Sequence, residues 1–166
     1  MDLRIFGVDP GSNHTGWGIL EVSGSKFTYL AAGTISPKGA LSDRLVAIAN
    51  ELDAKLDTYR PDVFAIERVF YAQNVKSALI LGQACGVALL CGARQNIPVF
   101  EYSATQIKQA ASGRGRATKE QVHHMLQMIL GAPKELSLDS SDALAVALCH
   151  AQTNHIEDRT QRLKNA

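Results

Sequence analysis

Two short apolar runs in this sequence each end at an acidic residue. Residues 3–8 are followed by Asp9 and a Pro-Gly pair, and residues 63–66 are followed by Glu67. Short, nearly continuous apolar runs are typical of strands buried on both faces of a parallel sheet. If a right-handed crossover makes the two strands parallel neighbours, their carboxyl ends meet at one edge of the sheet. We therefore expect Asp9 and Glu67 to lie together.

The remaining pattern predicts an α/β fold with a mixed five-stranded sheet. A Ser-Gly-Ser sequence at 23–25 separates two β-rich runs and indicates a hairpin, whereas the longer segments have apolar residues at helical spacing. We expect strands at 3–9, 15–22, 27–35, 63–67 and 97–100, and helices at 41–59, 75–94, 103–111, 118–130 and 138–154. The first three strands would be antiparallel and the later ones parallel, with helices flanking the sheet.

The length and the absence of internal boundaries predict one domain. A chain of 166 residues is long enough to bury a sizeable core. No repeat, low-complexity tract or linker divides it, so we expect a single domain over 1–155. The stretch 156–166 carries no motif, and we expect it to be a flexible C-terminal tail.

Composition favours a cytoplasmic protein that does not enter a membrane. No basic segment followed by an apolar one opens the chain. The longest apolar stretch, 78–93, is interrupted by glycines and Gln83, and we expect no segment to reach the roughly 18 apolar residues of a membrane span. Cys85, Cys91 and Cys149 lack metal-type or C-x-x-C spacing, which is typical of free thiols in a reducing compartment.

Two further acids occur in the last expected helix. Asp139 and Asp142 are spaced i, i+3 and therefore share one helical face. Ala143, Ala147 and Ala151 supply a slim surface that would let this helix approach the sheet. Four gathered carboxylates would repel one another and require cations. Two divalent ions about 3.5–4 Å apart suit such a cluster and serve phosphodiester cleavage.

Each acid also has a structural interpretation. Asp139 and Asp142 fit a helix N-cap and its capping-box partner. Asp9 before Pro-Gly can initiate a turn, and Glu67 can pair with a nearby arginine. The Asp-Pro-Gly turn also looks like the phosphate-binding hairpin of the actin, Hsp70 and sugar-kinase superfamily, but those proteins need two such domains and this chain has room for one.

A basic segment near these acids suggests contact with phosphate. Lys108, Arg114, Arg116 and Lys119 fall within residues 102–119, which contain no acid. Such a patch can bind nucleic acid even when the net charge of the chain is only +1. A solvated basic loop beside a helix would have the same composition.

The loop after Glu67 offers two aromatic side chains, Phe70 and Tyr71. An aromatic ring at this position could stack on an unpaired base, or it could act only as a hydrophobic staple for the next helix. Lys76, at the start of that helix, is a further candidate DNA contact. The helix 75–94 itself combines leucines with small residues, a pattern that suits either a dimer interface or an internal core helix. None of the five histidines is assigned to metal.

Several segments together resemble the RuvC-type Holliday junction resolvases, a family of the RNase H-like superfamily. The matching stretches, which occur in the expected order and spacing up to about His150, are Gly7-Val8-Asp9-Pro10-Gly11-Ser12, Ala65-Ile66-Glu67-Arg68-Val69-Phe70, Ser77-Ala78-Leu79, Gly82-Gln83-Ala84-Cys85-Gly86, Val99-Phe100-Glu101-Tyr102, Gln106-Ile107-Lys108-Gln109 and Asp142-Ala143-Leu144-Ala145-Val146-Ala147.

The resemblance implies a catalytic function and its ligands. It implies an RNase H-like fold and a homodimer that nicks two opposed strands of four-way DNA junctions in homologous recombination and repair, leaving 5′-phosphate and 3′-hydroxyl ends. It also implies Mg²⁺ or Mn²⁺, two ions per site, held by Asp9, Glu67, Asp139 and Asp142, although some members have His where Asp139 stands. A RuvAB-type branch-migration complex is the implied partner.

The resemblance also assigns DNA contacts. The junction-contacting aromatic of the family falls on Phe70, and two lysines thought to contact DNA fall on Lys108 and Lys119. Arg68 is a departure, because relatives often carry Gln there. Two other functions remain open at this point: a non-catalytic module that binds branched DNA, and an RNase H-like nuclease that acts on RNA or simple duplex.

Overall fold

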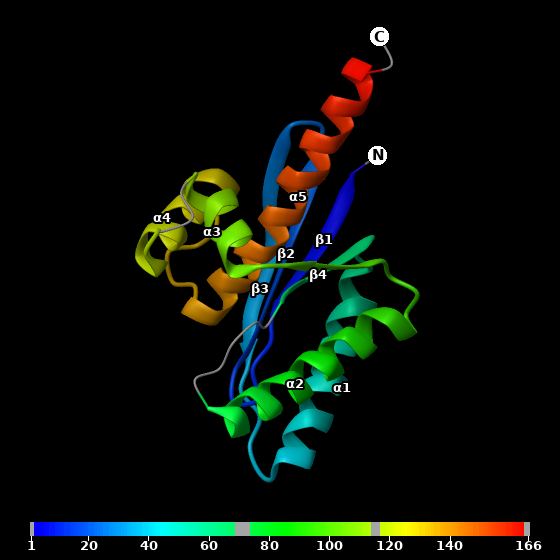
Figure 1. Ribbon diagram of the computed structural model, residues 1–166, viewed down its shortest axis with the longest axis vertical. Helices are drawn as coiled ribbons and strands as arrows, with labels where there is room; N and C mark the ends of the chain where they lie inside the picture. The colour runs from blue at the N-terminus through cyan, green and yellow to red at the C-terminus, as the bar shows by residue number, and fades with distance from the viewer. Residues whose placement is uncertain (1, 69–73, 114–116, 165–166) are drawn as a thin grey trace.

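The computed structural model describes residues 2–68, 74–113 and 117–164, with side chains described up to Asn154. Its five strands form one sheet in the order β3-β2-β1-β4-β5 (Figure 1). The strands are β1 (Leu3–Asp9), β2 (Thr15–Ser23), β3 (Lys26–Ile35), β4 (Val63–Glu67) and β5 (Val99–Tyr102). β1, β2 and β3 pair antiparallel, whereas β1, β4 and β5 pair parallel. The predicted fold class is confirmed.

Helices cover both faces of the sheet (Figure 1). α1 (Leu41–Tyr59) and α2 (Val75–Arg94) pack on one face. α3 (Ala104–Ser112), α4 (Lys119–Leu130) and α5 (Leu138–Lys164) pack on the other. Side chains of a strand alternate between faces, so Ile5 joins the core under α5 while Phe6 joins the core under α1 and α2. This burial on both faces explains why β1 and β4 are almost continuously apolar.

The last helix extends further than its sequence pattern predicts. We expected it to end near residue 154, whereas α5 continues to Lys164. No Gly or Pro occurs between Leu138 and Lys164, so no residue there terminates a helix. The expected tail 156–166 is therefore helical through Lys164, and both its flexibility and the domain boundary at 155 stay predictions.

The expectation that no segment is long and apolar enough to span a membrane is wrong for α2. This helix has 20 residues, and an 18-residue stretch of it has a mean hydropathy of 1.6 with 22% of the stretch buried. The small residues Ala84, Ala88 and Cys91 on one side are buried against the sheet and α1. Length and composition alone do not distinguish a membrane helix from one whose second apolar face meets another protein surface.

Glycines on β1 and β2 let α5 lie directly on the sheet. Gly7 and Gly18 are cross-strand neighbours. A side chain on Gly7 would overlap the carbonyl oxygen of Ala143 and lie 2.8 Å from the backbone nitrogen of Ala147. The expectation that the slim alanine face approaches the sheet is confirmed at these two residues. The close approach holds the start of α5 over the carboxyl ends of β1 and β4.

We expect Gly7→Ala to cost about 3 kcal/mol or more in the free energy of unfolding, because the added methyl group overlaps backbone that cannot retreat without lifting α5. Gly131→Ala is the matched control. Gly131 has a φ of 66° but open space around it, so Ala there should cost only about 1–2 kcal/mol through backbone conformation. Urea denaturation of both variants measures the difference, and equal losses would contradict the steric explanation.

Candidate active site

Asp9 and Glu67 lie at the same edge of the sheet. β1 and β4 are paired parallel with Val8 opposite Ile66, and each acid is the next residue of its strand. Both side chains are half-buried. The first expectation from the sequence, that these two strand ends meet, is confirmed.

Asp139 and Asp142 lie in the first turns of α5, close to the same edge. A side chain on Gly16, the cross-strand partner of Asp9, would overlap the carbonyl oxygen of Asp139. The N-terminus of α5 is capped by Ser137, whose Oγ accepts from the backbone N–H of Ser140 at 3.2 Å. The alternative in which Asp139 is the N-cap is therefore wrong, and its carboxylate is not needed for capping.

The four acids interact electrostatically. Burial, followed by the charges of Glu67, Asp142 and Asp139, raises the pKa of Asp9 to about 7 against the partial relief given by Lys119. The pKa of Glu67 is also raised, first by burial and then by Asp142. The charges of these acids therefore act on one another and leave the site with more negative charge than its neighbours neutralise. Their joint binding of an ion stays a prediction.

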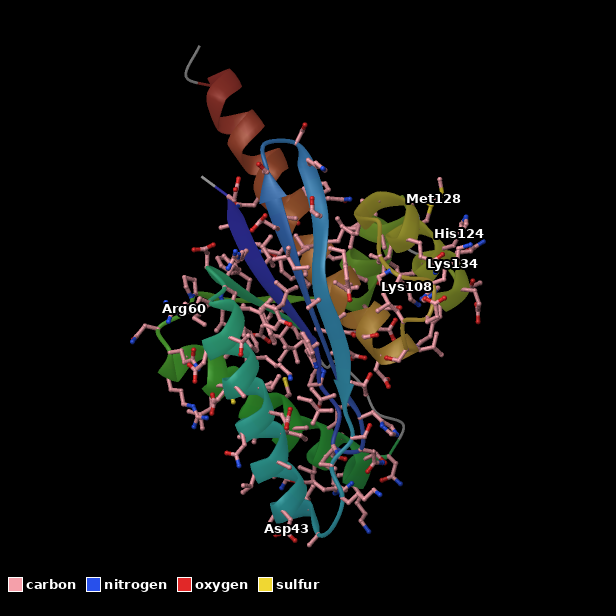
Figure 2. The ribbon with its side chains drawn as sticks, turned by 180° about the vertical axis from the view of Figure 1, so that it is seen from behind. Asp43, Arg60, Lys108, His124, Met128 and Lys134 are labelled. Atoms are coloured by element: carbon pink, nitrogen blue, oxygen red, sulfur yellow. The ribbon has the colours of Figure 1, made fainter. Side chains whose placement is uncertain are left out.

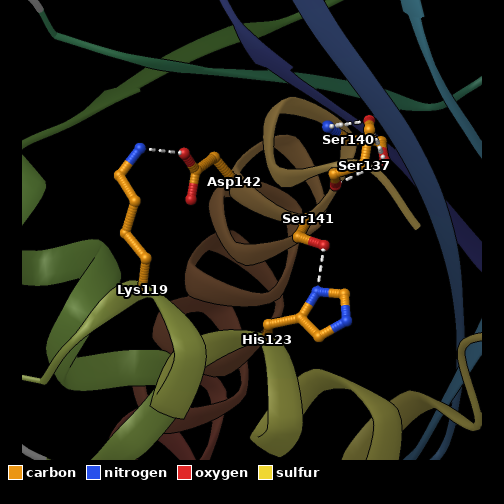
Figure 3. A network of polar contacts seen from close by, with 6 residues as sticks. All are labelled: Lys119, His123, Ser137, Ser140, Ser141 and Asp142. Carbon is orange, nitrogen blue, oxygen red and sulfur yellow. Dashed lines mark hydrogen bonds and ion pairs between the residues drawn. The ribbon is translucent and has the colours of Figure 1, made fainter. Parts of the chain in front are cut away.

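Lys119 is the basic side chain that binds this cluster directly (Figure 3). Its Nζ donates to Oδ2 of Asp142 at 2.8 Å, and this bond raises the pKa of Lys119. Lys119 is the first residue of α4, which begins with a capping box between Thr118 and Gln121. Thr118 is the N-cap of this helix, and it directs Lys119 from the helix terminus toward α5.

The turn after Asp9 is fixed by side chains. Thr15, which is fully buried, donates from Oγ1 to the carbonyl oxygen of Gly11 at 2.7 Å. The guanidinium of Arg44 donates to the carbonyl oxygen of Ser12 at 3.4 Å and to the side-chain oxygen of Asn13. These contacts hold the chain immediately beyond Asp9, and sequence analysis did not identify Thr15 or Arg44 because their partners become neighbours only after folding.

The chemistry of these donors fits a hard divalent cation. Carboxylate oxygens are the ligands that Mg²⁺ and Mn²⁺ prefer, and the raised pKa of Asp9 shows a need for added positive charge. Among the described residues, no three His, Cys, Asp or Glu side chains are yet placed to hold a metal ion jointly. Asp142 forms an ion pair with Lys119 instead. A bound ion would therefore have to draw the acids closer together.

The predicted DNA contacts are only partly described. Lys108 lies on α3, half-buried, and its charge acts on Glu67. Lys76 is exposed in the first turn of α2. Phe70 and Tyr71 lie in 69–73, outside the described residues, and so do Arg114 and Arg116 in 114–116. Arg68 lies with its Nε 3.7 Å from a carboxylate oxygen of Glu101.

A mixed sheet in this strand order, with acids at the ends of two central parallel strands and on the last helix, defines the RNase H-like class of nucleases. The family model for crossover junction endodeoxyribonuclease RuvC matches residues 5–150. The chain therefore belongs to the RuvC family of crossover junction endodeoxyribonucleases.

Individual relatives support this assignment. The chain is 50% identical over 151 residues to crossover junction endodeoxyribonuclease RuvC of Shewanella sp. strain MR-4, covering 90% of this chain and 87% of that protein. It is 45% identical over 156 residues to the RuvC of Pelobacter propionicus, covering 93% and 89%.

Solved structures agree in fold. The Thermus thermophilus RuvC in complex with a Holliday junction substrate matches with a TM-score of 0.87 and 31% identity, over 93% of this chain and 96% of that chain. The yeast mitochondrial Holliday junction resolvase matches with a TM-score of 0.68 over 97% and 84%, and at 17% identity it supports the fold alone.

The raised pKa of Asp9 predicts a pH-dependent stability. The folded protein holds this proton more tightly than the unfolded chain, whose Asp9 has the ordinary value of 3.8. The stabilisation from proton uptake is complete below pH 3.8 and is lost as the pH rises through about 7. Ionised Asp9 therefore destabilises the metal-free protein at pH 8.

Asp9→Asn should accordingly stabilise the metal-free protein on the order of 3 kcal/mol at pH 8, with a gain that fades as the pH falls toward 4. Chemical denaturation in EDTA across this range measures the effect. Asp57→Asn, at an exposed position of α1, is the control and should follow the wild-type curve. A gain that is the same at every pH would contradict the electrostatic origin.

Proposed function

We propose that this protein is a metal-dependent endonuclease that resolves four-way DNA junctions in homologous recombination and repair. It would nick two opposed strands and leave 5′-phosphate and 3′-hydroxyl ends. Membership of the RuvC family supports this activity, as does the close match to a RuvC bound to a Holliday junction substrate. The observation in this chain that carries the proposal is the carboxylate cluster that raises the pKa of Asp9 to about 7.

The proposed metal ligands are Asp9, Glu67, Asp139 and Asp142. Asp9 lies at the end of the central strand β1 and feels the charge of each of the other three acids, which makes it the best candidate to bridge two ions. When bound, two Mg²⁺ or Mn²⁺ ions would supply a water-derived nucleophile near neutral pH and stabilise charge on the scissile phosphate. The buried position of Asp9 and Glu67 keeps their charges poorly solvated, so these ligands favour cations strongly.

Basic residues around the cluster would bind the DNA backbone. Lys119 places its ammonium next to Asp142, where it can neutralise charge on the phosphate in the transition state. Lys108 lies near enough to Glu67 to lower its pKa. We assign phosphate contacts also to Lys76, Arg114 and Arg116 because of their positive charge. We assign base stacking to Phe70, where the resemblance places the junction-contacting aromatic, or to its neighbour Tyr71.

The exposed face of α2 is the proposed interface of a homodimer. Val75, Leu79 and Leu90 are 77%, 65% and 58% exposed. Their spacing places them on one side of the helix together with Gly82 and Gly86, which are also exposed. An apolar stripe with glycines lets a second helix approach closely. A two-fold dimer would present two active sites to the two equivalent strands of a junction.

The cellular setting follows from the family. A bacterial DNA-processing enzyme of this kind would act in the cytoplasm, where the chromosome lies, and we propose that it receives junctions from a RuvAB-type branch-migration complex. The exposed apolar face of α2 is assigned to the second subunit, so no membrane contact is needed to explain it.

Asp9→Asn should abolish junction cleavage while leaving junction binding within about twofold of wild type. Loss of this metal ligand should lower the cleavage rate by roughly 10⁴-fold, the scale seen when a catalytic group is removed. Phosphate contacts elsewhere would still support binding. Gel assays with labelled four-way junctions and linear duplex, in Mg²⁺ or in EDTA, measure both properties, and Asp57→Asn serves as the control.

The same assay separates the alternatives. Paired nicks on junctions that require Mg²⁺ support the resolvase. Wild-type binding without nicks would indicate a non-catalytic module, and equal cleavage of duplex or RNA would indicate a nuclease with another substrate. Loss of both binding and cleavage in a folded Asp9→Asn protein would argue against the metal-site assignment.

Leu79→Glu should convert the dimer to a monomer, because it places a charge in the centre of the apolar stripe on α2. Light scattering after size-exclusion chromatography should give twice the 17.9 kDa of one chain for wild type and the single-chain mass for the variant. Met128→Glu is the matched control, since Met128 is 70% exposed on α4. A monomeric wild type, or a dimeric Leu79→Glu protein, would overturn the interface.

A further inference from the structure

A second polar contact joins α4 to α5 beside the Lys119–Asp142 pair. Nδ1 of His123 lies 2.6 Å from Oγ of Ser141 (Figure 3). Ser141 is 2% exposed and His123 is half-buried, so the serine end of this part-buried hydrogen bond is shielded from water. The other ring nitrogen of His123 lies 2.9 Å from Nε2 of Gln127. Sequence analysis gave His123 no function, because its partner is on another helix.

The ring of His123 has polar contacts at both nitrogens. Its Nε2 lies 2.9 Å from Nε2 of Gln127 and 3.4 Å from the carbonyl oxygen of Lys134, and the Gln127 amide lies 3.5 Å from that same oxygen. A hydroxyl both donates and accepts, so Ser141 Oγ can form its bond to Nδ1 with either neutral tautomer. His123 and Gln127 thereby connect α4 both to the first turn of α5 and to the loop that precedes it.

The two interhelical contacts are adjacent on both helices. Lys119 and His123 are spaced i, i+4 and share one face of α4, with about 6 Å of rise between them. Their partners Asp142 and Ser141 are consecutive residues of α5. The His123–Ser141 bond therefore fixes the relative position of the two helices within one turn of the Lys119–Asp142 pair.

Lys119 cannot hold this position by its own ion pair. Its side chain is 62% exposed, and exposed ion pairs of a long lysine contribute little to structure. Buried hydrogen bonds contribute more to geometry, because leaving a buried partner unsatisfied is costly. Of the two contacts, the one between His123 and Ser141 is therefore the better anchor.

We propose that His123 is a positioning residue that holds Lys119 at the carboxylate cluster through its hydrogen bond to Ser141. The inference rests on the proposed nuclease function, since it assigns a precise location to the lysine that would neutralise phosphate charge. It also predicts an effect on metal binding that does not involve cleavage. Lys119 and a metal ion compete for the same carboxylate, Asp142. By holding Lys119 in place, His123 therefore weakens metal binding.

Loss of the His123–Ser141 bond should increase the affinity for the metal ion. When the anchor is removed, Lys119 is released and opposes the cation less, so the metal ion should bind more tightly. A contact that only maintained the shape of the site would have the opposite effect, because its loss would disorder the ligands and weaken metal binding.

The experiment measures Mn²⁺ binding to the full chain without DNA, by electron paramagnetic resonance of free Mn²⁺. His123→Leu removes the hydrogen bond, and His123→Asn retains a polar group near the place of Nδ1. Ser141→Ala removes the partner, and Lys119→Met removes the competitor. His124→Leu is the control, because His124 is exposed at the outer edge of α4 (Figure 2). Thermal melts confirm that each variant is folded.

We expect His123→Leu, Ser141→Ala and Lys119→Met to bind Mn²⁺ up to about fivefold more tightly than wild type, the factor that one hydrogen bond supplies. His123→Asn and His124→Leu should match wild type. In junction cleavage, His123→Leu should lower kcat about fivefold with KM within about twofold, and His123→Asn should restore kcat.

Unchanged or weaker Mn²⁺ binding in folded His123→Leu and Ser141→Ala proteins would overturn the inference. So would a loss of kcat that His123→Asn does not restore. Failure of the proposed function would be seen differently, as a wild-type protein that neither binds Mn²⁺ nor cuts junctions. A wild type that does both, with variants identical to it, would overturn the positioning function alone.

Discussion

Repulsion among carboxylates at one edge of the sheet is the constraint around which this structure is built. Asp9 and Glu67 are carried there by strands that are buried on both faces up to the residue before each acid, and both acids are half-buried. Asp139 and Asp142 add their charge from α5. Burial, and after it the charges of Glu67, Asp142 and Asp139, raises the pKa of Asp9 to about 7. A fold that gathers buried charge in this way is less stable above that pH, and bound cations would offset the loss.

The close packing of α5 on the sheet makes the gathering possible. A helix usually packs on a sheet with side chains filling the space between the two. Here Gly7 and Gly18 present bare backbone beneath Ala143, Ala147 and Leu144. The first turn of α5 is therefore lowered onto the strand ends that carry Asp9 and Glu67. The packing of α5 on the sheet therefore sets the position of Asp139 and Asp142 relative to Asp9 and Glu67.

The face opposite α5 has a different function. α1 completes the core with Ile48, Leu52 and Leu56, whereas α2 buries small residues and keeps a second apolar side exposed. One face of the sheet thus carries α5 with Asp139 and Asp142 and the helices of Lys108 and Lys119, and the other carries the exposed apolar side that we propose meets a second subunit. None of the four acids lies on α2, so the proposed dimer contact can be altered without replacing a proposed metal ligand.

The sequence alone predicted the mixed five-stranded sheet, the acids at the ends of β1 and β4, and the acidic face of the last helix, whereas the position of β5 beside β4 came from the tertiary structure. The predicted features depend on local periodicity and on the right-handedness of nearly all parallel crossovers. The tertiary structure alone decided that Ser137 rather than Asp139 caps α5, that Lys119 meets Asp142, that His123 meets Ser141, and which side of α2 stays exposed. Each of these depends on the distance between side chains on different elements, and that distance is fixed by packing of the whole chain, which no local pattern encodes.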